Sequence, residues 1–229
     1  MIILDKRTID EHKKNNPFIV LSDIIFKEFI NDIKTGKLLP GDKIIENKIA
    51  KDLDVSRTPV NIAINKALEQ KLFEKNEKRN IIVRKISFEE AYYLYESRKL
   101  IEGKAAYLAA KRISNKELSI LFDLLQRLKQ VDDVLDNDEF VKIDKIFHDT
   151  IIRASKDPYI IKMYKVLELD LQRYRYHFKQ LVVKRNKIEN GYMYHLAIYN
   201  ALYNRISNIA KEEIEADIDR MYGTIFTGI

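Results

Sequence analysis

Apolar positions in the first 85 residues follow two different spacings. Most recur three or four residues apart, as on one face of a helix, and two short runs are continuous, as in buried strands. The pattern predicts three helices and then two strands, at about residues 18–34, 46–53, 57–70, 72–73 and 81–83. The third helix is well defined, because Ser56 suits its N-cap and Pro59 falls in the first turn, where no backbone donor is lost. Three helices followed by a strand pair with a polar tip are typical of a winged helix-turn-helix.

The rest of the chain, from Ser87 onward, has helical spacing almost throughout. The predicted helices cover about residues 88–110, 115–131, 140–154, 158–181 and 192–204, with a last one from 207 or 208 onward. No strand alternates with these helices, so the pattern predicts an all-α bundle. We therefore predict a mainly α protein with two domains: a winged helix-turn-helix with a small β wing over 1–85, and an all-α helical bundle over 86–229.

The composition restricts the class of protein. Of the 229 residues, 46% are apolar and 33% are charged, which is typical of a globular chain. No apolar run approaches the roughly 18 residues of a membrane helix, and charged residues 5–7 interrupt the place of a signal peptide, so we expect a cytoplasmic protein with no membrane partner. The absence of cysteine excludes disulfides and thiolate metal sites and leaves His, Asp and Glu as the strong metal ligands.

The net charge of +6 is unevenly distributed along the chain. Residues 1–85 carry 18 Lys and Arg against 13 Asp and Glu, whereas residues 86–229 carry 23 against 22. A basic N-terminal domain joined to a nearly neutral body indicates a polyanion-binding head and a body with a different task.

Short motifs in both halves have the spacing of a known family. In the first half these are Gly36, Leu39-Pro40-Gly41, Ile49-Ala50 and Val55-Ser56-Arg57-Thr58-Pro59-Val60. In the second half they are Glu96-x-Arg98-x-x-Ile101-Glu102, Asp144-x-x-Phe147-His148 and His195-x-x-Ile198. The sequence resembles the GntR family of bacterial transcription regulators, and its body is similar to the FadR-like (FCD) branch. The resemblance covers nearly residues 18–222 and implies a dimeric repressor or activator, not an enzyme, whose bundle binds a small molecule, commonly a carboxylate and often through a metal.

The DNA-reading residues are expected at the start of the third helix. Arg57 and Thr58 open this helix, where side chains reach base edges in the major groove, and Asn61 lies one turn further on and suits adenine. The basic side chains expected at phosphates are Lys48, Lys66, Lys78 and Arg79. Asn61 and Asn47 replace arginines that are common in the family, so we expect a different operator. Asn80 replaces the usual wing glycine and is expected to tolerate φ > 0 there.

Four side chains of the bundle are candidate metal ligands. Asp144 and His148 are four residues apart on one predicted helix, so both can face one ion. His195 and Asp217 would lie about 33 Å apart on one straight helix, but a break near 206–207 would fold them level as an antiparallel hairpin. The family usually has histidine at the last position. We predict a divalent ion, Mn, Fe, Ni or Zn, held by this His₂Asp₂ set, against the alternative of ordinary polar core groups.

Two arginines are candidate clamps for a carboxylate effector. Arg98 and Arg173 lie on predicted bundle helices, where a buried guanidinium demands an anionic partner and can fork onto a carboxylate. Arg98 has an alternative, a plain surface ion pair with Glu102 four residues on.

Two other functions remain open from the sequence. The dipeptide His148-Asp149 also occurs in metal phosphohydrolases, which makes a metal-dependent helical hydrolase the alternative, although on a helix Asp149 points about 100° away from His148. A metal sensor with the ion as effector is the other. His12 and His177 have no partner at ligand spacing, so structural or exposed roles are expected for them. The preferred function is a homodimeric regulator that binds double-stranded operator DNA at a pseudo-palindromic site.

Overall fold

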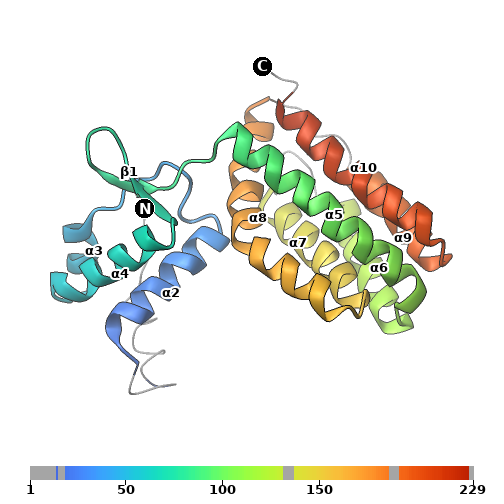
Figure 1. The fold of residues 1–229 in the computed structure, drawn as a ribbon, viewed down its shortest axis with the longest axis horizontal. Coiled ribbons are helices and arrows are strands. Elements are labelled where there is room, and N and C mark those ends of the chain that lie inside the picture. The colour runs from blue at the N-terminus through green and yellow to red at the C-terminus, as the bar shows by residue number, and fades with distance from the viewer. Residues whose placement is uncertain (1–13, 15–18, 131–136, 186–190, 227–229) are drawn as a thin grey trace. The chain divides into compact units, whose positions relative to one another are not determined.

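The computed structural model describes residues 14, 19–130, 137–185 and 191–226. The chain forms two compact units, residues 1–87 with 172–177, and residues 88–171 with 178–229. The first unit contains α2 (Leu21–Lys34), α3 (Glu46–Asp52), α4 (Arg57–Glu69), β1 (Phe73–Lys75) and β2 (Ile81–Val83). The second contains α5 (Phe88–Arg112), α6 (Asn115–Gln130), α7 (Asn137–Ala154), α9 (Gly191–Tyr203), α10 (Ser207–Phe226) and α8 (Pro158–Arg185) except for residues 172–177 (Figure 1). The predicted fold class, a mainly α chain with a small β wing, is confirmed.

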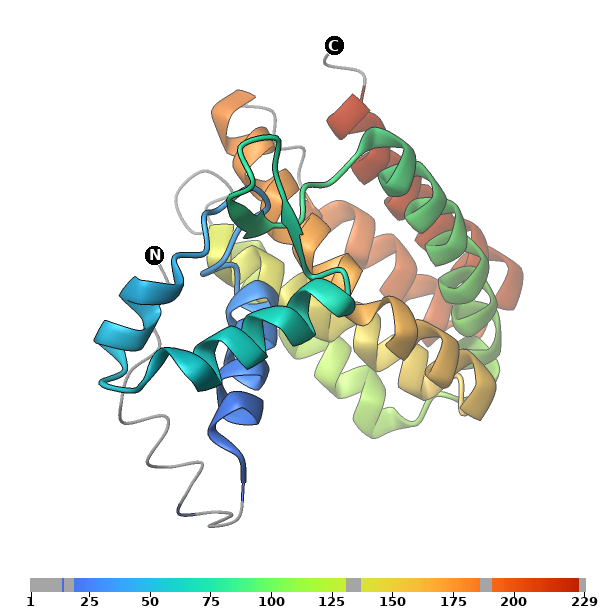
Figure 2. The ribbon, with the colours of Figure 1, turned by 60° about the vertical axis from the view of Figure 1, so that its left-hand side comes forward.

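The first unit is built around the contact between α2 and α4, which lie against each other in Figures 1 and 2. Phe29 and Phe73 are fully buried, and their ring centroids are 5.0 Å apart, so the first helix anchors the first strand. β1 and β2 pair antiparallel, with Phe73 opposite Val83. The helix pair and the strand pair share one core, which holds α4 against the wing and leaves its other face exposed.

The turn of the wing differs from the prediction at one residue. Arg79, and not Asn80, has the positive φ, at 59°. The Asn76 side chain accepts hydrogen bonds from the backbone N–H of Lys78 and of Asn80, both at 3.0 Å, and Arg79 N–H bonds to the Asn76 carbonyl at 2.8 Å. The residue with left-handed backbone conformation is therefore Arg79, two residues before β2 begins. It lies one residue earlier than position 80, where the family usually has glycine.

In the second unit, α5 and α10 run side by side over most of their length, as both views show (Figures 1 and 2). α5 also packs on α7, and α6 packs on α7 and α9. The buried core that they share includes Leu121, Phe147, Ile198 and Ile214. Helices from distant parts of the sequence therefore meet around one core. Among the described residues, no helix is both long and apolar enough to cross a membrane.

The ends of the helices in both units follow the sequence signals in most cases. Ser114 and Glu117 form a reciprocal capping box at the start of α6, because Glu117 accepts from the Ser114 N–H at 2.8 Å and Ser114 Oγ accepts from the Glu117 N–H at 3.3 Å. Asp157 caps α8, where its carboxylate accepts from two backbone N–H groups. Ser56 has the extended backbone of an N-cap, but its side chain makes no capping hydrogen bond. That hydroxyl is exposed ahead of the first turn of α4.

Candidate metal centre and DNA-binding surface

The four predicted metal ligands come together inside the second unit. Asp144 and His148 lie on α7, His195 lies on α9 and Asp217 on α10, and one ligand atom of each is within 4.8 Å of the others. The predicted break is confirmed, since α9 ends at Tyr203 and α10 begins at Ser207. All four side chains are buried, with exposed fractions between 0 and 6%. We call these four residues the metal cluster.

Hydrogen bonds on the far side of each ring fix the two histidines. His148 Nδ1 lies 2.6 Å from a carboxylate oxygen of Glu102, and His195 Nδ1 lies 2.9 Å from the carbonyl oxygen of Gly191. Both partners only accept hydrogen bonds, so Nδ1 carries the hydrogen in both rings. In the neutral ring the lone pair is then on Nε2. Both Nε2 atoms face the cluster, which is the tautomer that a metal ligand needs.

The spacing of the donor atoms suits an ion. His148 Nε2 is 3.4 Å from Asp144 Oδ1 and 3.4 Å from Asp217 Oδ2, and His195 Nε2 is 3.4 Å from Asp144 Oδ1. Ligands at about 2.1 Å from an ion would be about 3.4 Å apart around a four-coordinate ion and about 3.0 Å apart, as neighbours, around a six-coordinate one. Within the part of the chain that the structure describes, neither the two Nε2 atoms nor Asp217 Oδ2 has a hydrogen-bond partner, although all three are buried. Buried polar atoms are rarely left in this state, so the residues present fit a metal ion.

Glu102 connects the metal cluster to Arg98. Its second carboxylate oxygen accepts a hydrogen bond from Arg98 Nε, and both side chains are buried, at 0 and 1% exposure. The pairing of Arg98 with Glu102 is therefore present, but it is a buried ion pair and not the surface pair that was the alternative. The spacing of Arg98 and Glu102 revealed their pairing, whereas nothing in the sequence pointed to the contact of Glu102 with His148, 46 residues away.

The buried charge around the metal cluster depends on whether His148 is protonated. Burial opposes ionisation of Glu102, but Arg98 and His148 outweigh it and lower the pKa of Glu102 to about 2. Burial likewise disfavours a charged His148, yet Glu102 and Asp144 raise the pKa of His148 well above its usual value. Arg98 and Glu102 cancel each other, so the two aspartates leave two buried negative charges when His148 is neutral, and protonation of His148 would offset one of them. A divalent cation bound to the neutral ring would supply the opposite charge in place of that proton.

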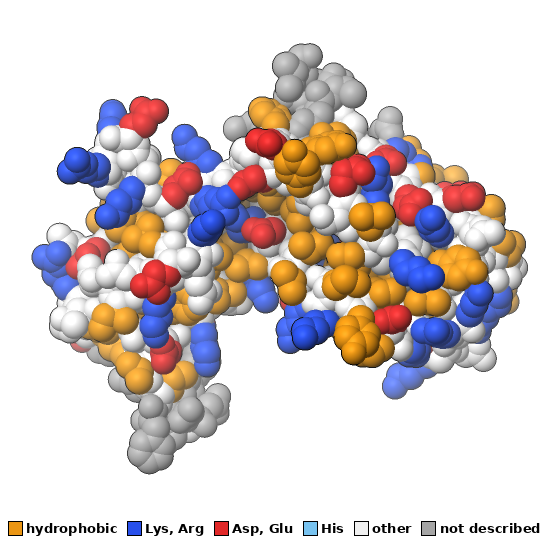
Figure 3. Space-filling model, viewed as in Figure 1, with side chains coloured by type: hydrophobic (Ala, Val, Ile, Leu, Met, Phe, Trp, Pro, Cys, Tyr) orange, Lys and Arg blue, Asp and Glu red, His pale blue; other side chains and the backbone are white. Residues whose placement is uncertain are grey.

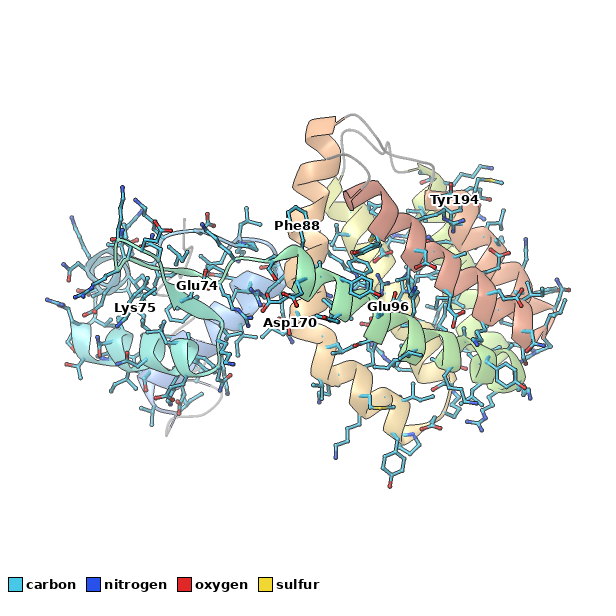
Figure 4. The ribbon with its side chains drawn as sticks, turned by 45° about the horizontal axis from the view of Figure 1, so that its top comes forward. Glu74, Lys75, Phe88, Glu96, Asp170 and Tyr194 are labelled. Atoms are coloured by element: carbon cyan, nitrogen blue, oxygen red, sulfur yellow. The ribbon has the colours of Figure 1, made fainter. Side chains whose placement is uncertain are left out.

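Two neighbours of the metal cluster have contacts of their own. Asp149, which the hydrolase alternative would use, is paired with Lys145 on the same helix and is not part of the cluster. Arg220, which no sequence pattern singled out, places one nitrogen 3.8 Å from Asp217, and its guanidinium lies over the ring of Tyr194, which Figure 4 labels on α9. Arg220 is thus a second cation beside the site.

The predicted DNA-reading residues share one exposed face of the first unit. Arg57, Thr58 and Asn61 are all exposed on the first two turns of α4. Glu46, at the start of α3, accepts hydrogen bonds from Arg57 Nε at 3.0 Å and from Asn61 Nδ2 at 3.1 Å. Asn65 continues the row, donating to Asn61 Oδ1 at 2.9 Å. We call Arg57, Thr58 and Asn61 the recognition surface. The role of Glu46 could not be predicted from the sequence, because its contacts join residues 11 and 15 positions apart.

The remaining predicted residues have differing surroundings. Lys48 is exposed on α3, Lys78 and Arg79 are exposed at the tip of the wing, and basic side chains gather over the wing in Figure 3. Lys66 is paired with Asp23 of α2, so a phosphate would have to compete with that carboxylate. Arg173 belongs to residues 172–177, which group with the first unit, and it donates to the Arg84 carbonyl at 2.8 Å. His12 and the side chain of His177 lie outside the described residues.

Comparison with known proteins connects both halves of the chain to one family. The family model of the FCD domain matches residues 93–220, and that of bacterial regulatory proteins of the gntR family matches residues 21–83. The Nta operon transcriptional regulator of Aminobacter aminovorans is 28% identical over 54% of this chain and 58% of its own length. The HTH-type transcriptional regulator McbR of Escherichia coli K12 is 25% identical over 73% of this chain and 78% of its own.

The chain thus spans little more than half of the first of these relatives. A solved structure also supports the fold. E. coli McbR/YncC superposes with a TM-score of 0.71 at 16% identity, covering 92% of this chain and 99% of that one. At this identity the likeness shows a common fold, while the chemistry of the site rests on the residues described above.

Proposed function

Because this chain belongs to the GntR family of bacterial regulatory proteins and carries an FCD domain, we propose that it is a transcriptional regulator that binds double-stranded operator DNA with its first unit and a divalent metal ion with its second. A protein that binds a bacterial operator works in the cytoplasm. The exposed recognition surface on α4 supports the DNA-binding part of the proposal, since the first turns of such a helix reach base edges in the major groove.

One observation carries the metal part. Both histidines of the metal cluster donate from Nδ1 to fixed acceptors, so both Nε2 lone pairs converge on the two aspartates in a buried space. Asp144, His148, His195 and Asp217 would hold the ion, whose chemistry here is to bind and orient an anionic effector. Two carboxylates and two imidazoles form a harder set than three imidazoles and one carboxylate, which suits Mn, Fe, Ni or Zn.

The experiment for the metal is elemental analysis of protein purified without a His tag. We expect one divalent ion per subunit in the parent. The double variant His148→Ala, His195→Ala should contain none, because half of the ligands are gone. The same metal content in the double variant would place the ion elsewhere and contradict the proposal.

We further propose that the effector is a small carboxylate. Four protein ligands leave a six-coordinate ion two positions for an effector, and Arg98 is the candidate anion clamp in the same unit. Glu102 already holds Arg98 through Nε, so a carboxylate would have to compete with Glu102 for that guanidinium. Calorimetric titration with small carboxylic acids, with and without metal, tests this. If metal alone changes the affinity for DNA and no acid binds, the ion is the effector.

Finally, we propose that the protein is a homodimer on a two-fold operator. One winged helix-turn-helix offers few base contacts, and pairing two of them doubles the selectivity available. Three apolar side chains on α8, Tyr159, Met163 and Val166, are 49 to 76% exposed and are spaced four and three residues apart, which places them in one row. Such a row suits a protein interface. Sedimentation of the free protein and of its complex with DNA gives the number of subunits directly.

A further inference from the structure

One carboxylate holds two side chains of the recognition surface, and the proposed function leaves it unexplained. Glu46 accepts from Arg57 Nε with one oxygen and from Asn61 Nδ2 with the other. Arg57, Asn61 and Asn65 follow one another at intervals of four residues, so they form a row along one face of α4. Glu46 comes from the preceding helix and joins this row from the side.

We propose that Glu46 is a positioning residue that presents Arg57 and Asn61 to DNA as one base-reading unit, and thereby sets which bases the protein selects. The inference rests on the proposed function, because it concerns the same DNA-binding surface. Glu46 is argued to act through these two side chains and not through a contact of its own.

The contact with Glu46 leaves the reading atoms of Arg57 available. It uses only Nε, so both terminal nitrogens of the guanidinium can still fork onto O6 and N7 of guanine. A guanidinium on a long exposed side chain otherwise samples many rotamers, and holding it in one orientation reduces the entropy that is lost on binding. Arg57 is thereby oriented to donate two parallel hydrogen bonds from its terminal nitrogens to one base.

The same holds for Asn61. Since the Glu46 carboxylate can only accept, the atom of Asn61 that faces it must be Nδ2, which fixes the orientation of the amide. The hydrogen bond from Asn65 to Oδ1 agrees with this orientation. An amide has two donor hydrogens and two acceptor lone pairs, so one of each remains for N7 and N6 of adenine. These hydrogen bonds thus fix which donor and which acceptor of Asn61 face the DNA.

The charge of Glu46 argues for selectivity and not for affinity. Its side chain is 21% exposed beside the recognition surface, and the hydrogen bonds from Asn61 and Arg57 lower its pKa, so the carboxylate stays ionised. An anion so close to the expected DNA phosphates weakens binding to every sequence. Binding is therefore favourable only where the contacts of Arg57 and Asn61 with matching bases outweigh this repulsion. A penalty on all other sequences raises the specificity of the protein.

The test uses the full-length protein and a library of random DNA duplexes. The bound duplexes define the preferred site, and titrations then compare this site with its single-base variants. Glu46→Gln keeps the size of the side chain but turns one acceptor toward Arg57 or Asn61 into a donor. We expect its discrimination at the bases read by Arg57 and Asn61 to fall about tenfold, while its affinity for random duplexes stays equal or rises.

Glu69→Gln is the matched control. Glu69 is exposed at the last residue of α4 and lies about 18 Å along the helix from Arg57, so its substitution removes the same charge without touching the network. We expect this variant to keep the base discrimination of the parent. The double variant Glu46→Gln, Arg57→Ala should discriminate no worse at the Arg57 base than Arg57→Ala alone, because Glu46 acts there through Arg57.

Any of these results would overturn the inference: unchanged discrimination in Glu46→Gln, an equal loss in Glu69→Gln, or effects of Glu46→Gln and Arg57→Ala that simply add at that base. Equal weakening of Glu46→Gln on all duplexes would also overturn it, since that is the effect of damaged folding. If the parent protein selects no duplex at all, the proposed DNA-binding function fails as well, and this outcome is distinct from the others.

Discussion

Glu102→Gln is the most informative substitution in the helical unit, because this one carboxylate accepts from donors on two sides. One oxygen faces His148 Nδ1 at 2.6 Å and the other faces Arg98 Nε. A glutamine offers one oxygen and one NH₂ group. Whichever way the amide turns, one of these two donors faces another donor.

The size of the effect follows from the burial of the partners. Arg98 is 1% exposed, and removal of one partner from a buried ion pair typically costs about 3–5 kcal/mol. If the NH₂ group of the glutamine faces His148 instead, the imidazole carries its hydrogen on Nε2. That nitrogen then has no lone pair for a metal. Loss of such a supporting hydrogen bond lowers metal affinity about 10- to 100-fold. We therefore expect a lower free energy of unfolding without metal and weaker metal binding.

Two measurements separate these effects. Urea unfolding of the metal-free and metal-loaded forms gives the stability that the ion adds, and competition with a coloured chelator gives its affinity. At a fixed excess of metal, a 10- to 100-fold weaker site should lower the added stability by about 1.4–2.7 kcal/mol. Glu139→Gln is the control, because its pair with Arg127 is partly exposed and is expected to be worth less than about 1 kcal/mol. Equal added stability in Glu102→Gln and the parent would refute the role of this hydrogen bond.

Three further substitutions test other parts of the structure. Arg57→Ala should cost about 1–3 kcal/mol of DNA binding and relax the preference at one base per half-site, as binding titrations over single-base variants will show; uniform weakening would reduce Arg57 to a phosphate contact. Asp217→His should retain an ion and shift preference toward softer metals, measured by competition between metals. Glu117→Gln tests the capping box: Lys156 and Ser114 lower the pKa of Glu117 despite its burial, so the parent should be more stable at neutral pH. That difference should disappear in acid unfolding curves as the pH falls below about 4.3 and through the lowered pKa.

The meeting of the four candidate metal ligands could be predicted from the sequence because helix geometry is regular. Asp144 and His148 share a face by spacing alone, and the turn residues near 206 fix how α9 and α10 fold back. The residues that orient the ligands could not be predicted. Glu102 meets His148 only through the packing of α5 on α7, and Gly191 takes part through its backbone carbonyl, which any residue possesses.

The same distinction applies to the DNA-binding unit. Its helices and the exposure of Arg57 follow from periodicity and capping signals, whereas the contact of Glu46 depends on the angle between α3 and α4. In the wing, the predicted φ > 0 residue was displaced by one position because the side chain of Asn76 organises the turn. Local spacing determines the elements, and contacts between elements determine how their side chains are oriented.

The metal cluster has a further consequence for the lifetime of the protein. Its ligands lie 73 residues apart between Asp144 and Asp217, in a chain without cysteine. An ion joining them would act as a cross-link, and closing a loop of this length restricts the unfolded chain by about 4 kcal/mol if the chain entropy behaves as it does for a disulfide. Copies that lack the ion would lose this restriction, unfold more readily and become more accessible to proteases. The supply of metal in the cell would then control how long each molecule persists.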